Sequence, residues 1–213
     1  MSAVIRRAAS IIAARPSDDG FEMLVLERGA ASRFLPSYVA FPGGSVERSD
    51  ADLSERWFAS RDEDARACAV RELVEEVALA LTGDGLAEVP GRSFEGVDAD
   101  PPSTAQLTEI AHWIAPPDVP VRFDARYFAV TAPASLEARA DGDETADAWW
   151  ISPRALLEDW REGKRKLYWP TFFTVSSIAS CDSVEDLLAF RLETREPDDD
   201  DVERLPRSVF WQD

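Results

Sequence analysis

The spacing of hydrophobic and polar positions predicts strands interleaved with helices. Residues 4–14 form a mostly apolar run, and alternation resumes over 21–27 after the turn-forming segment 16–20. Two such runs joined by a short turn predict a β-hairpin. Further strands are predicted at 39–41, 113–114, 122–130 and 146–151. This order of elements indicates an α/β or α+β fold.

Residues 62–81 have a helical period instead. At about 100° per residue, the apolar side chains fall on one side of this helix, and Glu72, Glu75 and Glu76 fall on the other. The glycine-containing segment 82–85 is expected to end the helix. Residues 86–103 are rich in Gly, Pro and Asp and are expected to form loops.

Two more helices are predicted from their capping residues. Ser152 followed by Pro153 is typical of a helix start, and that helix is expected to reach about residue 161. Ser183 opens a second helix through about residue 192. The polar segment 47–61 contains the apolar pair Trp57 and Phe58, which could act as a lid, a packing anchor or part of a dimer interface.

Composition narrows the class of protein. The chain has 213 residues and a net charge of -18, which disfavours nucleic-acid binding because a phosphate backbone needs a basic surface. Two cysteines and one histidine exclude a disulfide framework and a His-based zinc site, and a reducing, cytoplasmic setting is expected. No apolar run is long enough to span a membrane. We expect one domain over 1–195, with an insert at about 47–61, and an acidic tail over 196–213.

The candidate chemistry lies on the helix with the glutamates. Glu72, Glu75 and Glu76 are spaced i, i+3 and i+4, so their charges share one face and repel. A divalent cation would compensate this repulsion, since Mg²⁺ prefers oxygen ligands and bridges carboxylates to phosphates. The alternative is an ordinary solvated acidic face. The upstream Gly43 and Gly44 favour a site, because glycine lets backbone N–H groups approach a phosphate closely.

Two segments together resemble the Nudix box of the Nudix hydrolase superfamily. They are Phe-Pro-Gly-Gly at 41–44 and Arg71-Glu72-Leu-Val-Glu75-Glu76. In that pattern a Gly and then a Glu precede the Arg-Glu-apolar-x-Glu-Glu-x-Gly segment. Here 20 residues separate Asp50 from Arg71, where the family has seven, so either the box is split by an insertion or Glu63 fills the acidic position. Ala78 stands where the family has its closing Gly.

A split box is similar to that of the coenzyme A diphosphatase-like branch. Further parts of the chain also resemble that branch. They are the segments 26–28, 33–36, 38–44, 113–116, 122–128 and 170–171, with Glu144 and Trp150. The resemblance covers roughly residues 4–190. It implies a Nudix α/β/α sandwich with a mixed β-sheet, an insertion within the box and a helical C-terminal extension.

The resemblance also implies site roles. Glu72, Glu75 and Glu76 would bind Mg²⁺ (or Mn²⁺) and Arg71 would hold a carboxylate in position. The general base would be a glutamate of the box or Glu144. Substrate binding is expected from Gly43 and Gly44 and from the arginines Arg28, Arg33, Arg122 and Arg126. In a strand, however, Arg122 and Arg126 share a face with Asp124, which favours a structural ion-pair network.

The leading hypothesis is a diphosphatase that converts CoA or acyl-CoA to 3′,5′-ADP and (acyl-)phosphopantetheine. An alternative is cleavage of another small nucleoside diphosphate derivative, such as ADP-ribose or an NADH-type dinucleotide. A different class is a non-catalytic Nudix-fold binding module, although such modules usually lose their metal glutamates and this chain keeps three. No nucleic-acid or membrane partner is expected, and a homodimer is left open.

Overall fold

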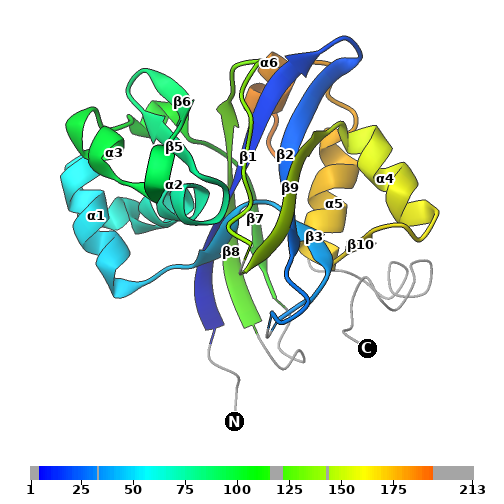
Figure 1. Ribbon diagram of the computed structural model, residues 1–213, viewed down its shortest axis with the longest axis horizontal. Coiled ribbons are helices and arrows are strands. Elements are labelled where there is room, and N and C mark those ends of the chain that lie inside the picture. The colour runs from blue at the N-terminus through cyan, green and yellow to red at the C-terminus, as the bar shows by residue number, and fades with distance from the viewer. Residues whose placement is uncertain (1–4, 33, 116–121, 143, 194–213) are drawn as a thin grey trace.

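The computed structural model describes residues 5–32, 34–115, 122–142 and 144–193, and it is built around one eight-stranded mixed sheet (Figure 1). The strand order is β10-β3-β2-β1-β8-β7, with β4 paired to β1 and β9 paired to β2. The strands are β1 (Ile5–Ser17), β2 (Gly20–Arg28), β3 (Tyr38–Ala40), β4 (Gly43–Ser45), β7 (Thr108–Ile114), β8 (Arg122–Thr131), β9 (Thr145–Ile151) and β10 (Lys166–Leu167).

Helices cover both faces of this sheet. One face carries α1 (Arg48–Phe58), α2 (Asp64–Val77), α3 (Glu95–Ala99) and a small hairpin of β5 (Leu79–Thr82) and β6 (Gly85–Glu88). The other carries α4 (Pro153–Arg161), α5 (Trp169–Ile178) and α6 (Val184–Ala189). Short 3₁₀ turns lie at Arg61–Glu63, Pro90–Arg92 and Thr104–Gln106. The predicted α/β/α sandwich with a mixed sheet is confirmed.

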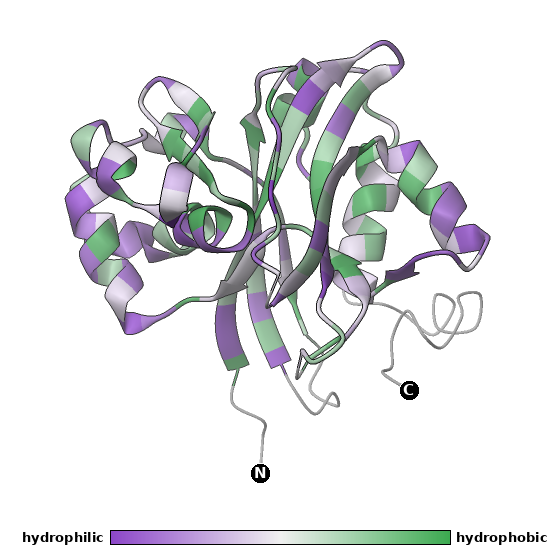
Figure 2. Cartoon of the chain, in the orientation of Figure 1, coloured by the Kyte–Doolittle hydropathy of each residue, from purple (hydrophilic) through white to green (hydrophobic). Residues whose placement is uncertain are grey.

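Strand β1 is buried on both faces. Ala9, Ile11 and Ala13 pack with α2, whereas Ile12 and Ala14 pack with α4 and α5. A strand covered on both sides needs a continuous apolar run rather than alternation, which explains the pattern at 4–14. Figure 2 shows the same distribution, with hydrophobic positions on the sheet and on the inner sides of the helices.

The sheet forks beside β1. β1 and β2 pair only near their turn, where Ala14–Ser17 face Gly20–Met23. Further from the turn, Ala8–Ser10 of β1 pair with β4, while Leu26 and Glu27 of β2 pair with β3. Residues 41–42 connect β3 to β4 across the fork, and the Ile11 N–H donates to the Pro42 carbonyl (2.9 Å). The fork therefore leaves space between β3 and β4.

The predicted helix over 62–81 is shorter than expected. It ends at Val77, because Ala78 adopts a left-handed conformation (φ 56°) and its N–H bonds the carbonyls of Leu73 and Val74. This reversal is the usual way to end a helix, and glycine would serve it best. Leu79 to Thr82 instead form β5, and the segment 82–85 is the turn of a hairpin rather than the helix end.

Regular structure is present in one region that was expected to form loops and in one for which no helix or strand was predicted. Residues 86–103 contain the end of β6, a 3₁₀ turn and α3. The insert forms α1, and Trp57 is its packing anchor: the residue is 4% exposed and its indole N–H donates to Asp98 (2.7 Å). These elements form because each buries a few apolar side chains against α2 and β5, which local composition does not reveal.

The helices predicted from capping residues are present. The Ser152 hydroxyl accepts from the Ala155 N–H at the start of α4, and the Ser183 hydroxyl accepts from the Asp186 N–H at the start of α6. α6 ends at Ala189, three residues earlier than expected. α5 was not predicted, because its largely apolar sequence is buried on more than one side and shows no amphipathic period.

In the described part of the chain, no helix is both long and apolar enough to cross a bilayer. The acidic tail predicted at 196–213 and the predicted substrate residue Arg33 lie outside the described residues.

Candidate active site

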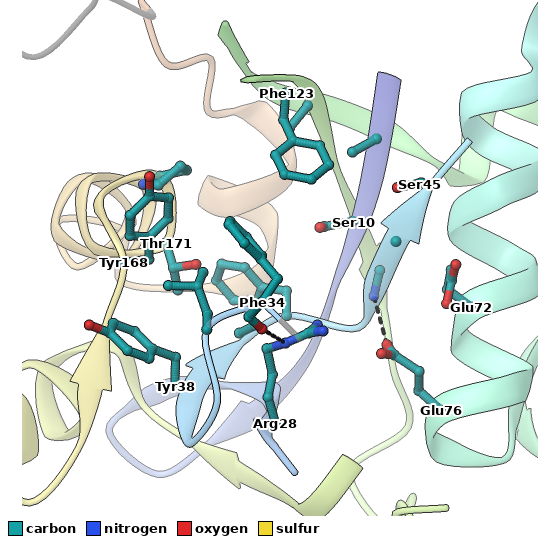
Figure 3. Close-up of a pocket in the computed structure, with 18 of the residues that line it drawn as sticks. Ser10, Arg28, Phe34, Tyr38, Ser45, Glu72, Glu76, Phe123, Tyr168 and Thr171 are labelled. Atoms are coloured by element: carbon teal, nitrogen blue, oxygen red, sulfur yellow. Dashed lines mark hydrogen bonds between the residues drawn. The ribbon is translucent and has the colours of Figure 1, made fainter. Parts of the chain in front are cut away.

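A cavity of about 350 Å³ opens at the fork of the sheet (Figure 3). Its floor is the face of β1 and β8 that carries the small side chains Ala8 and Ala125, which lie side by side in register. β3, β4 and the start of α5 form the walls, and α2 closes one end. The cavity exists because small residues face a point where two strands diverge.

Two glutamates of α2, both among the predicted metal ligands, line this end of the cavity. Glu76 is 5% exposed, and the Gly43 N–H donates to its Oε2 (2.8 Å; Figure 3). Glu72 lies against Gly44, where a Cβ atom would come within 2.1 Å of its Oε1. The Gly-Gly pair therefore admits two carboxylates to the backbone of β4, and any side chain at Gly44 would displace one of them.

Burial strongly affects the protonation of this pair. Desolvation raises the pKa of Glu72 to about 7, although Arg71 works against the shift. Desolvation, followed by repulsion from Glu72, raises the pKa of Glu76 to about 8, although the Gly43 N–H and Arg28 work against the shift. The positive charges and hydrogen-bond donors around each carboxyl thus do not offset the cost of burying its charged form.

Arg71 is the cationic centre of the site. Its Nε and Nη2 bind the two carboxylate oxygens of Asp50 (2.8 and 3.2 Å). Its Nη1 donates to Glu72 Oε1 (2.9 Å) and Glu75 Oε2 (2.8 Å), and its Nη2 donates to the Ser45 carbonyl (3.2 Å). One guanidinium therefore fixes the insert, β4 and the carboxylate helix relative to one another.

Asp50, not Glu63, is the acid that pairs with Arg71. Asp50 is 0% exposed, belongs to the first turn of α1 and also accepts from the Glu47 N–H (2.7 Å). Glu63 pairs with Arg66 instead. The inserted helix thus brings Asp50 back to Arg71 across 20 intervening residues, and the sequence had left these two alternatives open.

The donor set fits a divalent cation. Asp50, Glu72 and Glu75 place three carboxylates around one guanidinium, Glu76 adds a fourth beside the Gly43 N–H, and hard cations prefer such oxygen ligands. Glu75 turns toward Arg71 with its side chain 47% exposed. Among the described residues, no three carboxylate, His or Cys side chains converge as one ready-made metal-binding group. Glu72 and Glu76 are accordingly the pair best placed to hold a cation, and Glu75 remains a predicted ligand.

The other predicted site residues divide into two sets. Arg28 and Glu144 line the cavity, with Arg28 donating to the Phe34 carbonyl (3.0 Å; Figure 3). Arg122 and Arg126 are not brought to it. They lie on the opposite face of β8, where Arg122 binds the Ala115 carbonyl (3.1 Å) and Arg126 pairs with Glu109 (3.1 Å). The geometry therefore supports the other hypothesis for these two arginines, that they take part in a structural hydrogen-bond and ion-pair network.

Sequence reasoning missed the wall opposite the glutamates. Ser10 and Thr171 hydrogen-bond the buried Tyr127 hydroxyl, whose pKa is raised by desolvation. Phe34 packs against Phe123 (ring centroids 5.4 Å apart) and further ring contacts extend this wall. The remaining unpredicted lining residues include Arg6, Tyr38 and Tyr168. The sequence did carry one signal for this wall: side chains alternate along a strand, so residues 6, 8 and 10 share one face of their strand and residues 123, 125 and 127 share one face of theirs.

The two glycines should respond differently to alanine. At Gly43 the new Cβ would lie 2.4 Å from the Ala9 carbonyl oxygen and 2.7 Å from Ser10 Cα, so β1 and β4 must separate. At Gly44 it meets only the carboxylate of Glu72. We expect Gly43→Ala to lower the free energy of unfolding by about 2 kcal/mol or more, as overpacking does. Gly44→Ala should lose activity with a smaller stability change.

Urea unfolding and initial rates, measured on both variants, test this contrast. Equal stability losses at the two positions would contradict the assignment of Gly43 to strand pairing and of Gly44 to the glutamate.

Fold and site together define an α/β/α protein with an arginine-braced carboxylate cluster at the end of a cavity. The family model of the NUDIX domain matches residues 4–169, and the chain belongs to this family. The predicted Nudix hydrolase is thereby confirmed at the level of the family.

Three similar proteins agree with this assignment. A NUDIX hydrolase of Alicyclobacillus acidocaldarius, known from its crystal structure, superposes with a TM-score of 0.77 at 27% identity, covering 91% of this chain and 99% of that one. "Putative nudix hydrolase 7" of Caenorhabditis elegans is 27% identical over 82% of this chain and 60% of its own length. "Acyl-coenzyme A diphosphatase NUDT19" of Gallus gallus is 25% identical over 87% and 71%. The chain thus spans less than two thirds of the nematode relative.

Proposed function

We propose that the chain is a divalent-metal-dependent diphosphatase and that its substrate is CoA or acyl-CoA, cleaved to 3′,5′-ADP and (acyl-)phosphopantetheine. The observation that carries the proposal is the buried pair Glu72 and Glu76 beside the backbone of Gly43. Such a pair has too little positive charge around it in the protein alone. A cation with a bound diphosphate supplies that charge and meets the oxygen ligands that it prefers.

Glu72 and Glu76, with Glu75 adjacent, would hold Mg²⁺ (or Mn²⁺). When bound, the cation neutralises the diphosphate and activates the attacking water. Arg71 fixes the Glu72 carboxylate from behind through Nη1 (2.9 Å), and the Gly43 N–H fixes Glu76 (2.8 Å). Arg28, at the same end of the cavity, offers a positive charge to a substrate phosphate. The chain therefore orients both the carboxylates and the diphosphate.

The water's proton needs an acceptor, and Glu144 is the candidate best placed outside the metal set. It is exposed and lines the cavity from the loop between β8 and β9. That loop is anchored to the end of α2, since the Asp141 N–H donates to the Glu76 carbonyl (3.1 Å), and to the residue after β2, since the Gly29 N–H donates to the Glu144 carbonyl (2.8 Å). A carboxylate held this way can take a proton at the mouth of the site.

Two features support CoA over other nucleoside diphosphates. The cavity combines the cations Arg6 and Arg28 with an aromatic wall, so it can accept a substrate that carries more than one phosphate group and an apolar arm. The chicken relative is named an acyl-coenzyme A diphosphatase. Neither ADP-ribose nor a dinucleotide of the NADH type carries a phosphate outside its diphosphate, so a second cationic position would have no use with them.

The experiment is a substrate panel. Purified chain is incubated with CoA, acetyl-CoA, ADP-ribose, NADH and diadenosine polyphosphates, with Mg²⁺, with Mn²⁺ and with a chelator, and the products are identified by mass spectrometry. We expect 3′,5′-ADP from CoA or acetyl-CoA only when metal is present. Preferential turnover of ADP-ribose or NADH would retain the chemistry and discard the CoA assignment. Absence of any turnover would favour a binding module.

A further inference from the structure

The cavity has a second cationic position, further along β1 than the residues that pair with Gly43 and Gly44. Arg6 lines it from β1, on the same strand face as Ala8 and Ser10. Ser10 pairs with Gly43, which holds Glu76. Arg6 and Ser10 are four positions apart along the strand, or about 13 Å between Cα atoms. If one end of a ligand lies at Gly43 and the ligand extends along β1, its other end would therefore lie near Arg6.

Arg6 has no carboxylate partner within the described ranges, in contrast to its neighbour. The Arg7 guanidinium binds both carboxylate oxygens of Asp64 (2.5 and 2.7 Å) on the other face of β1. Arg28, the other cation of the cavity, donates to the Phe34 carbonyl and lies beside Glu76. The charge of Arg6 is therefore left available to an anionic group of a ligand in the cavity, and such a charge-assisted pair is strong.

Aromatic rings flank this position. Phe123 lies beside Arg6 in the β1–β8 register, and Phe34 contacts both Phe123 (5.4 Å) and Tyr168 (6.0 Å) through its ring. Figure 3 shows these rings on the wall away from Glu72 and Glu76. The three rings are half-buried, so part of each faces the cavity. This end of the cavity thus combines ring surfaces with one unpaired cation, which suits a nucleoside that carries a phosphate.

We propose that Arg6 is a specificity residue that binds a phosphomonoester on the nucleoside half of the substrate, outside the diphosphate that is cleaved. The inference rests on the proposed diphosphatase function and extends it. It assigns to Arg6 the choice between a nucleoside diphosphate derivative with a ribose phosphate and one without. For CoA, the group recognised is the 3′-phosphate of the ribose.

The test compares substrates that differ only in this group. CoA and 3′-dephospho-CoA both contain the diphosphate, so kcat and KM are measured for each with wild type, Arg6→Ala, Arg6→Lys and the control Arg7→Ala. We expect Arg6→Ala to raise KM for CoA about tenfold or more, as the loss of a charge-assisted hydrogen bond does. KM for dephospho-CoA should change less than about twofold, with kcat retained for both. Arg6→Lys should recover part of the CoA effect, and Arg7→Ala should keep the wild-type ratio of the KM values for CoA and dephospho-CoA.

A binding measurement separates this inference from the catalytic proposal. Calorimetric titration with adenosine 3′,5′-bisphosphate and with 5′-AMP requires no turnover. Tighter binding of the bisphosphate, lost in Arg6→Ala and kept in Arg7→Ala, would support the role of Arg6 even in a chain that hydrolyses neither substrate. Equal effects of Arg6→Ala on CoA and dephospho-CoA, or equal effects of Arg6→Ala and Arg7→Ala, would overturn it while leaving diphosphate hydrolysis intact.

Discussion

Glu76→Gln is expected to lower kcat/KM for the diphosphate substrate by roughly 10²- to 10³-fold, the range lost when a preorganised charge is removed from an active site. The substitution keeps the shape of the side chain and an oxygen that can accept from the Gly43 N–H (2.8 Å). It removes the negative charge that a cation needs at this buried position of the cavity lining. Initial rates over a range of Mg²⁺ concentrations measure the effect, and added metal should recover little of it.

The fold should tolerate this change. The pKa of Glu76 is raised to about 8 by burial, so near neutral pH its carboxyl is already largely protonated in the metal-free protein. We therefore expect Glu76→Gln to be at least as stable as wild type without metal. A Glu76→Gln enzyme with wild-type rates would remove the glutamate pair from the mechanism.

Arg71→Met is expected to lower the free energy of unfolding by about 3–5 kcal/mol, because it leaves a buried carboxylate without its partner. Asp50 is 0% exposed and receives two hydrogen bonds from this guanidinium (2.8 and 3.2 Å). Glu72 and the Ser45 carbonyl lose a donor as well. Urea unfolding of the variant and wild type measures the loss, and activity should fall with it because Glu72 is no longer fixed.

A double-mutant cycle isolates the ion pair. Asp50→Asn in the Arg71→Met background removes the stranded charge and should recover part of the lost stability, whereas Arg71→Lys keeps the charge but cannot form the two-point contact. A loss below about 1 kcal/mol in Arg71→Met, the value typical of surface pairs, would mean that Arg71 does not brace the insert against α2.

The carboxylate helix could be predicted because its signal is local. Glu72, Glu75 and Glu76 share a helix face through their spacing alone, and the Gly-Gly pair precedes them in sequence. The end of the helix was predicted too late because Ala78, without the freedom of glycine, still adopts the left-handed conformation. Here the tertiary context outweighs local preference, since β5 pairs with β6 and buries Leu79 and Leu81 against α2.

The opposite wall of the cavity could not be predicted, because it depends on register and on the fork. Strand alternation places Arg122 and Arg126 on one face and Phe123 and Tyr127 on the other, but it does not say which face meets the cavity. Pairing of β8 with β1 places Phe123 beside Arg6, and divergence of β1 from β2 opens the space. Asp50 likewise needed the folded insert to be identified, since only α1 brings it to Arg71.

The central claim is that Glu72 and Glu76 form the metal centre of a diphosphatase. The most direct test is a Mn²⁺ titration followed by electron paramagnetic resonance, with CoA hydrolysis measured in the same samples, for wild type and the Glu72→Gln/Glu76→Gln variant. The account predicts that wild type binds Mn²⁺ and forms 3′,5′-ADP in proportion to the bound metal. The variant should bind at least tenfold more weakly and form no product. Equal Mn²⁺ affinity and equal hydrolysis in a folded variant would contradict it.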